Sequence, residues 1–154
     1  MVEPTFEVKM TQIGDMQFKA EFDIGKWEPI YFDEPESVPG GKGEYPNASR
    51  MLAASVLNCL SASLNFCLMK SRIPADNIRG VIKGTIARNE RGRWRIKSLE
   101  AKLIAHYDQA DDTIRHKFER CKELFFDFCI VSASIKEGSI NIKVDAEMEE
   151  GKKE

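Results

Sequence analysis

The sequence has little of what metal centres and disulfide frameworks require. It contains only two histidines, His106 and His116, and its four cysteines include no Cys-x-x-Cys pair. We therefore expect no structural metal and no cofactor. The first residues include Glu3 and Glu7 and lack the apolar core of a secretory signal. We expect a cytoplasmic, reducing environment, in which cysteines are not held in static disulfides.

A strong charge of either sign is also missing. The chain has 23 Lys and Arg against 25 Asp and Glu, which gives a net charge of −2. Nothing therefore attracts the whole protein to nucleic acid or to an anionic membrane. Hydrophobic residues make up 42% of the chain, which excludes a wholly disordered protein. The length fits a single domain over residues 1–154, with a frayed tail at 147–154.

One uncharged run, residues 51–69, is long enough to cross a membrane. Five serines and asparagines interrupt it, and Lys70 follows at once. Apparent strands on both sides are typical of a globular domain. We therefore expect a helix that is buried along most of its circumference, and no membrane partner.

The N-terminal third alternates polar and apolar residues in a β pattern. Residues 5–10 and 16–22 predict a hairpin, and residues 27–32 predict a third short strand. Residues 33–46 contain three prolines and three glycines, so they predict a loop. Loops of this length are often functional.

The middle of the chain predicts a long helix followed by a strand pair. Asn47 can cap a helix over residues 48–72, because Pro74 prevents its continuation. Residues 77–88 and 93–105 then read as two strands joined by a short turn.

A second helix should begin at Asp111 or Asp112. Its apolar face would consist of Ile114, Phe118, Cys121, Phe125 and Phe128. Residues 129–135 and 140–146 then predict two closing strands. The predicted fold class is α+β, with antiparallel sheets packed on a long central helix and a second helix.

Two segments together resemble one protein family. They are NASRMLAASVLNCLS, residues 47–61, and FCIVSASIKEGSINIKV, residues 128–144. The loop 33–41, with its DEP and GG motifs, and IPADNIRGVIKG, residues 73–84, add to the likeness. The chain resembles the OsmC/Ohr family of osmotically inducible and organic-hydroperoxide-resistance proteins, and most of all its OsmC-like branch. The resemblance covers residues 6–144.

This resemblance implies an intertwined homodimer with two active sites at the subunit interface. It also implies a thiol peroxidase that acts on organic hydroperoxides in oxidative-stress defence. Cys59 would be the peroxidatic cysteine, which becomes a sulfenic acid. Cys129 would be the resolving cysteine, which forms a disulfide with it. A small thiol or a dihydrolipoyl group would then reduce this disulfide.

The residues themselves limit how the cysteines can pair. Cys59 and Cys67 lie eight positions apart on the predicted helix, about 12 Å along its axis, and cannot form a disulfide. Cys129 follows the second helix, where the fold could bring it beside Cys59. Cys67 and Cys121 read as small buried hydrophobic residues.

The sequence departs from the family pattern near Cys59. Active members place a glutamate nine or ten positions before this cysteine, where this chain has Arg50 and Ser49. They also carry an N-terminal arginine, whereas this chain has only lysines there, such as Lys19. Arg50 and Lys19 are the candidate supporting cations, although Arg50 lies about 13 Å from Cys59 along the helix. We therefore expect Cys59 to titrate at or above the value of a free cysteine.

Two other functions remain open from the sequence. The fold could bind a small apolar ligand without chemistry, in a pocket lined by Phe66, Phe125, Phe126 and Phe128. The cationic strand around Trp94 could instead contact nucleic acid, with Arg91, Arg93, Arg95 and Lys97. On a strand, however, these charges would face water while Trp94 faces the core, so we expect no nucleic-acid partner.

Overall fold

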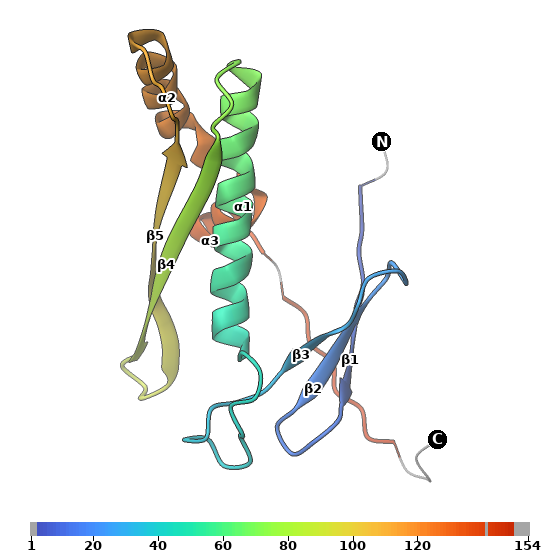
Figure 1. Ribbon diagram of the computed structural model, residues 1–154. Coiled ribbons are helices and arrows are strands. Elements are labelled where there is room, and N and C mark those ends of the chain that lie inside the picture. Colours follow the sequence, from blue (N-terminus) through green and yellow to red (C-terminus); the bar gives the residue numbers. More distant parts are fainter. Residues whose placement is uncertain (1–2, 141, 150–154) are drawn as a thin grey trace.

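The computed structural model describes residues 3–140 and 142–149, and Figure 1 shows their arrangement. Three short strands, β1 (Val8–Gln12), β2 (Phe18–Phe22) and β3 (Ile30–Phe32), form one antiparallel sheet. The long helix α1 (Ala48–Lys70) follows. A long antiparallel ribbon comprises β4 (Asn77–Arg88) and β5 (Trp94–His106), and three short helical segments complete the chain: α2 (Asp112–Leu124), η1 (Phe125–Phe128) and α3 (Ile130–Glu137). The predicted α+β class is confirmed.

The sheet of β1, β2 and β3 stands beside the rest of the protein (Figure 1). β2 is its central strand, and it pairs with β1 from Gln12↔Phe18 to Val8↔Phe22. Within the described residues, the sheet packs to no substantial extent against α1, the ribbon or the later helices. Apolar side chains such as Phe6, which is 87% exposed, therefore lie open on this part of the chain.

Asp33 organises the loop between β3 and α1. Its carboxylate is 1% exposed and accepts four hydrogen bonds. The donors are the side-chain amide of Gln17 (3.1 Å) and the backbone N–H groups of Glu34, Lys42 and Glu44 (2.7, 3.3 and 3.0 Å). Burial raises the pKa of this carboxyl, but the hydrogen bonds outweigh it, and the pKa lies below its usual value. The loop predicted to lack regular structure is therefore folded around one buried charge.

The helix α1 starts where the sequence predicts and ends at Lys70, two residues before the predicted end at residue 72. The side chain of Asn47 accepts a hydrogen bond from the backbone N–H of Arg50 (3.2 Å), which caps the first turn. Arg72, with φ of 61°, turns the chain away after the last turn, just ahead of Pro74.

Only one face of α1 is buried. That face consists of Val56, Leu60, Ser63, Leu64 and Leu68. On the other side Phe66 is 54% and Met69 59% exposed. The expected burial around most of the circumference is therefore wrong for the single chain. By length and composition α1 could cross a membrane, but its buried face packs on β4, α2, η1 and α3, as a core helix does.

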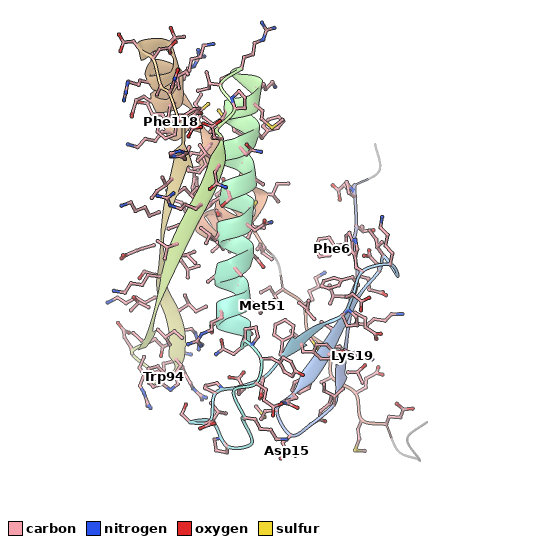
Figure 2. All side chains as sticks on the ribbon, in the orientation of Figure 1. Phe6, Asp15, Lys19, Met51, Trp94 and Phe118 are labelled. Atoms are coloured by element: carbon pink, nitrogen blue, oxygen red, sulfur yellow. The ribbon has the colours of Figure 1, made fainter. Side chains whose placement is uncertain are left out.

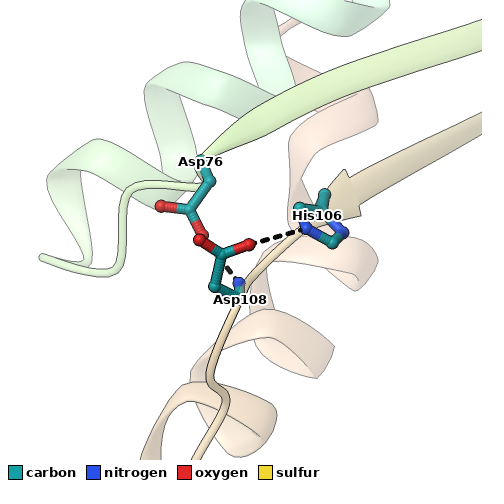
Figure 3. Close-up of polar contacts among 3 residues, drawn as sticks. All are labelled: Asp76, His106 and Asp108. Atoms are coloured by element: carbon teal, nitrogen blue, oxygen red, sulfur yellow. Dashed lines mark hydrogen bonds and ion pairs between the residues drawn. The ribbon is translucent and has the colours of Figure 1, made fainter.

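The ribbon of β4 and β5 lies against α1 at Gly80. A Cβ atom at this position would meet Leu103 Cδ2 at 2.7 Å and Leu57 Cδ1 at 3.0 Å, so glycine permits the close approach. A polar cluster closes the open end of the ribbon (Figure 3). There His106 Nε2 and Asp108 Oδ1 are 3.0 Å apart, and the backbone N–H of Asp108 donates to Asp76 Oδ2 (2.8 Å).

Trp94 lies at the tip of the ribbon (Figure 2). Its side chain is 60% exposed, and the guanidinium of Arg88 lies 4.6 Å from the centroid of its ring. The expectation that Trp94 faces the core is therefore wrong. The tip of the hairpin offers no core to this ring, and the arginine covers it instead.

The segment after α2 differs most from the prediction. Residues 129–135 form no strand, because Cys129 caps α3 and the helix runs over 130–137. Gly138, with φ of 65°, ends it, and its backbone N–H donates to the carbonyl of Ile135. The side-chain cap at Cys129 and the stop at Gly138 favour a short helix, which outweighs the strand preference of Ile130 and Val131. The second predicted strand, 140–146, includes residue 141, which lies outside the described residues, and the described part contains no strand.

Asp33→Asn should loosen the loop 33–46. The carboxylate offers two acceptor oxygens to its four donors, whereas an amide offers only one. Some of the donors would therefore lose their partner. We expect faster tryptic cleavage at Lys42 in limited proteolysis at pH 7, whereas Glu36→Gln, an exposed position in the same loop, should cleave like the unmodified protein. Since the pKa of Asp33 is lowered, the protection should persist above the usual carboxyl value and disappear as pH falls through the lower folded value. Equal cleavage of both variants would contradict this role.

Candidate functional site

The four cysteines meet as two pairs along α1. Cys59 packs against the buried cluster that contains Cys129, and Cys67 packs against the one that contains Cys121. Cys129 is close enough to raise the pKa of Cys59, and Cys121 is close enough to raise that of Cys67. All four are free thiols. The structure thus brings together Cys59 and Cys129, the two residues that the family resemblance singled out. It also pairs the two cysteines that were expected to be plain core residues.

Cys129 is fully buried and sits at the start of α3. Its sulfur lies 3.4 Å from the backbone nitrogen of Ser132, which donates to it, and 3.0 Å from the Ser132 hydroxyl oxygen. Burial raises the pKa of the Cys129 thiol, but hydrogen bonds with Cys59, Ser132 and Ser63 outweigh burial. The pKa of Cys129 is therefore lowered.

Cys59 lies one helical turn before Ser63, on the half-buried edge of α1. Burial raises the pKa of its thiol, and the hydrogen bond and charge of Cys129 raise it further. This agrees with the expectation that Cys59 titrates at or above the value of a free cysteine. The two members of the pair thus differ in acidity, with Cys129 the more acidic.

The surroundings of this pair are apolar. Val56 and Leu60 of α1 pack with Cys129 into one buried cluster. The cluster is completed by half-buried side chains of the ribbon, η1 and α3, namely Ile82, Leu99, Leu103, Phe125, Phe126 and Val131. Among the described residues no group of three His, Cys, Asp or Glu side chains could hold a metal ion. The chemistry available at this site is that of two thiols in a water-poor setting.

A cavity of about 810 Å³ adjoins the pair. It lies between α1, the ribbon and the C-terminal helices, and Ser132 joins its wall to Cys129. Phe125 and Phe126 line it, as the sequence suggested. Phe66 and Phe128 instead contact each other edge to face, with ring centroids 6.4 Å apart.

The two candidate cations lie elsewhere in the single chain. Arg50 is at the first turn of α1, where its guanidinium is 3.5 Å from the side-chain oxygen of Asn47. Lys19 lies on β2, in the sheet that stands apart from α1 (Figure 2), and its ammonium is 3.6 Å from Glu21. Neither is among the groups that shift the pKa of Cys59 or Cys129. A role for either residue would require a second copy of the chain or a movement of the loops.

The second pair belongs to a different core cluster. Cys121 is buried with Leu64, Leu68 and Ile73, and Cys67 packs against this cluster. The Ser71 hydroxyl oxygen lies 3.4 Å from the Cys121 sulfur. Burial, followed by the hydrogen bond and charge of Cys121, raises the pKa of Cys67 to about 11. The prediction that both residues are core is confirmed by this packing.

The sequence alone did not single out Ser132 or Ser63. Ser132 is hydrogen-bonded to Cys129, and Ser63 acts to lower the pKa of both Cys59 and Cys129. Ser132 follows Cys129 by three residues, the spacing between a helix cap and the backbone N–H that it accepts from. That spacing was the available signal, but it carries meaning only once the segment is known to be a helix.

The raised pKa of Cys67 predicts a slow thiol. At pH 8 a thiol with a pKa of about 11 is about 100-fold less ionised than one with the usual value of 9.0. Alkylation of Cys67 by iodoacetamide should therefore be slow and rise about tenfold per pH unit between pH 7 and 9, as measured by peptide mass mapping. Cys121→Ser should speed this reaction, and Cys129→Ser should leave it unchanged. A plateau below pH 9 would contradict the assignment.

Comparison with known proteins identifies the family of this chain. Residues 41–145 match the family model described as OsmC-like protein. The fold is similar to the OsmC-like protein of unknown function from Vibrio cholerae, with 14% identity over 86% of this chain and 94% of that one and a TM-score of 0.69. No match was found among curated proteins.

Two further similar structures carry functional names. One is the organic hydroperoxide resistance protein OsmC from Legionella pneumophila, with 15% identity over 88% of this chain and 92% of that one and a TM-score of 0.64. The other is the organic hydroperoxide resistance protein OhrB of Bacillus subtilis, with 18% identity over 86% and 90% and a TM-score of 0.56. At these identities the likeness shows the fold. Together with the family match over most of its length, it shows that the chain belongs to the OsmC family of proteins.

Proposed function

We propose that this protein is a thiol-dependent reductase of organic hydroperoxides that acts through Cys59 and Cys129. The observation that carries the proposal is the contact of these two thiols beside an apolar cavity. The cavity offers room for the organic part of a hydroperoxide, and the pair offers the two electrons that its reduction needs. The names of similar structures from Legionella and Bacillus support the same class of substrate.

The proposed reaction uses both cysteines in turn. The Cys59 sulfur attacks the outer oxygen of the hydroperoxide, the O–O bond breaks, and the organic oxygen takes a proton and leaves as an alcohol. Cys59 is then a sulfenic acid. The Cys129 sulfur attacks it, a disulfide forms, and the hydroxyl leaves as water. A small thiol or a dihydrolipoyl group reduces the disulfide by exchange. We place this activity in cytoplasmic oxidative-stress defence.

Hydroperoxide should oxidise this pair before the other one. One equivalent of cumene hydroperoxide added to reduced protein should give an intramolecular Cys59–Cys129 disulfide, located by peptide mass mapping. Cys59→Ser should abolish it, whereas Cys129→Ser should leave a sulfenic acid that dimedone traps. The reaction should be slow at pH 7 and accelerate toward pH 9, because the pKa of Cys59 is raised. Prior oxidation of Cys67 or Cys121 would refute the assignment.

We further propose that the working form is a homodimer. Within the described residues the β1–β3 sheet has no partner layer, and a small sheet is stabilised when its apolar face is covered. The outer face of α1 is open, and Ile142 and Val144 near the C-terminus are 78% and 85% exposed. A second copy could cover these surfaces and bring Arg50 or Lys19 toward the site.

The dimer can be tested by mass in solution. Light scattering should give twice the chain mass of 17.5 kDa at micromolar concentration. Replacing both Ile142 and Val144 with Asp should shift the mass toward one chain, because it places charges in an apolar interface. Lys143→Asp, which adds an acid to the same segment, is the matched control and should leave the mass unchanged. A monomer at all concentrations would refute the proposal.

A second candidate function is binding of a small apolar ligand without redox chemistry. The cavity of about 810 Å³ and its Phe125 and Phe126 walls favour it. The peroxide titration separates the two functions, because a pure binding protein would keep its free thiols at one equivalent of hydroperoxide.

A further inference from the structure

The two thiol pairs on α1 sit in different electrostatic surroundings. Each has a serine hydroxyl beside one sulfur, Ser132 beside Cys129 and Ser71 beside Cys121. Among the four described cysteines, Cys129 caps a helix, and its side chain accepts the backbone N–H of Ser132 at 3.4 Å. The backbone N–H of Val131, in the same helical turn, acts to lower the pKa of Cys59, but burial and Cys129 outweigh it. Cys121 lies inside α2, where the helix uses its own backbone donors. The described cysteines therefore form two pairs, and only the pair of Cys59 and Cys129 includes a cysteine that caps a helix.

We propose that Cys129, and not Cys59, carries the negative charge of the reduced pair, and that Ser132 is the positioning residue that holds this charge in place. The placement of the charge stands on the structure alone. Its part in turnover rests on the proposed hydroperoxide reductase function.

The physical reason is the start of α3. The first N–H groups of a helix have no partner within it, and together they carry about half a positive charge. The Ser132 N–H lies 3.4 Å from the Cys129 sulfur, and the hydroxyl at 3.0 Å can turn to donate to a thiolate. Cys129 is 0% exposed, so water does not screen these interactions. The lowered pKa of Cys129 and the raised pKa of Cys59 agree with this placement.

Within a single chain, charged side chains contribute little in comparison. Apolar residues of α1, the ribbon, η1 and α3 pack around Cys129, and its polar partners Ser63 and Ser132 carry no charge. The charged residues that these elements carry nearby are exposed to water, and Lys136 Nζ lies over the Phe126 ring at 5.1 Å. They are Lys83 on β4, Glu100 and Lys102 on β5, Asp127 on η1, and Lys136 and Glu137 on α3. Water and salt weaken their fields at the sulfur.

This placement makes Cys129 active from the first step. While Cys59 is still protonated, its proton passes to the Cys129 thiolate as its sulfur attacks the outer peroxide oxygen; toward pH 9 the faster direct attack by the Cys59 thiolate adds to this route. The organic oxygen, leaving with the O–O electron pair, takes that proton and becomes the alcohol, so Cys129 is again a thiolate. Cys129 then attacks the sulfenic sulfur of Cys59. The S–O bond breaks as the S–S bond forms, and the hydroxide leaves and is neutralised to water by one proton from the buffered solvent.

The charge can be located without chemical access to the buried sulfur. In the reduced, full-length protein labelled with ¹³Cβ-cysteine, the Cβ shift of each cysteine is followed against pH by NMR and assigned with single Cys→Ser variants. We expect Cys129 to have the lowest midpoint. Ser132→Ala should raise that midpoint by about one pH unit or more, which is a tenfold loss of thiolate. Ser132→Thr should largely restore it, and the matched control Ser71→Ala should leave it unchanged.

Two results would overturn the placement: a lowest midpoint at Cys59, or equal effects of Ser132→Ala and Ser71→Ala. If Ser132→Ala does not fold, the ranking of midpoints in the unmodified protein decides. The base role has its own readout, the single-turnover rate of cumene hydroperoxide consumption. Cys129→Ser should slow it about tenfold or more, and an unchanged rate would overturn that role. Low titration of Cys129 without any peroxide reduction would instead refute the proposed function and leave the charge placement standing.

Discussion

The rest of the structure depends on the single buried face of α1. Its buried side chains follow one another along the helix from Val56 to Leu68, and each later element packs on this stripe. The apolar stripe serves two clusters in turn, one around Cys129 and one around Cys121. Because Cys59 and Cys67 lie eight residues apart on the same helix, the face that builds the core also aligns the two thiol pairs.

The open face of α1 has a consequence for assembly. A 23-residue helix in a chain of this length can be covered on one side by a two-stranded ribbon and short helices, but not on both. The β1–β3 sheet, which would be the remaining layer, stands apart from it (Figure 1). The open face of α1 and the sheet both expose apolar side chains, and a second copy of the chain would cover such surfaces. A second copy would also be one route by which Arg50 or Lys19 could approach Cys59.

The sequence predicted elements well wherever one local rule acted alone. The cap at Asn47 and the stop before Pro74 bounded α1, and the alternation over 77–88 gave β4 to the residue. The prediction failed where two rules competed. Over 129–135 the β-branched Ile130 and Val131 favoured a strand, but the cap at Cys129 and the glycine at 138 closed a two-turn helix. The closing strand 140–146 needs a neighbouring strand that the described residues of one chain do not provide.

The site was predictable only in part for the same reason. The family resemblance named Cys59 and Cys129, and the structure brings them into contact. Their difference in acidity could not be read from the sequence, because it depends on the helix that begins at Cys129. Reading 129–135 as a strand hid Ser132, since on a strand a residue three positions on faces the opposite side of the sheet. One mistake, a strand predicted where α3 forms, therefore explains both the wrong secondary structure and the failure to predict Ser132.

The polarity of the pair also bears on how an oxidised site would be reduced. In thiol–disulfide exchange, the sulfur whose thiol is more acidic leaves more readily, and the attack falls on the more accessible sulfur. Here both conditions select the same direction, because Cys59 is the half-exposed member and Cys129 the buried one with the lowered pKa. A reductant would thus attack Cys59 and release Cys129 directly into its hydrogen bonds with Ser132. In the proposed cycle, the start of α3 would in this way serve the resolving and the reducing steps at Cys129, while the first attack by Cys59 stays slow.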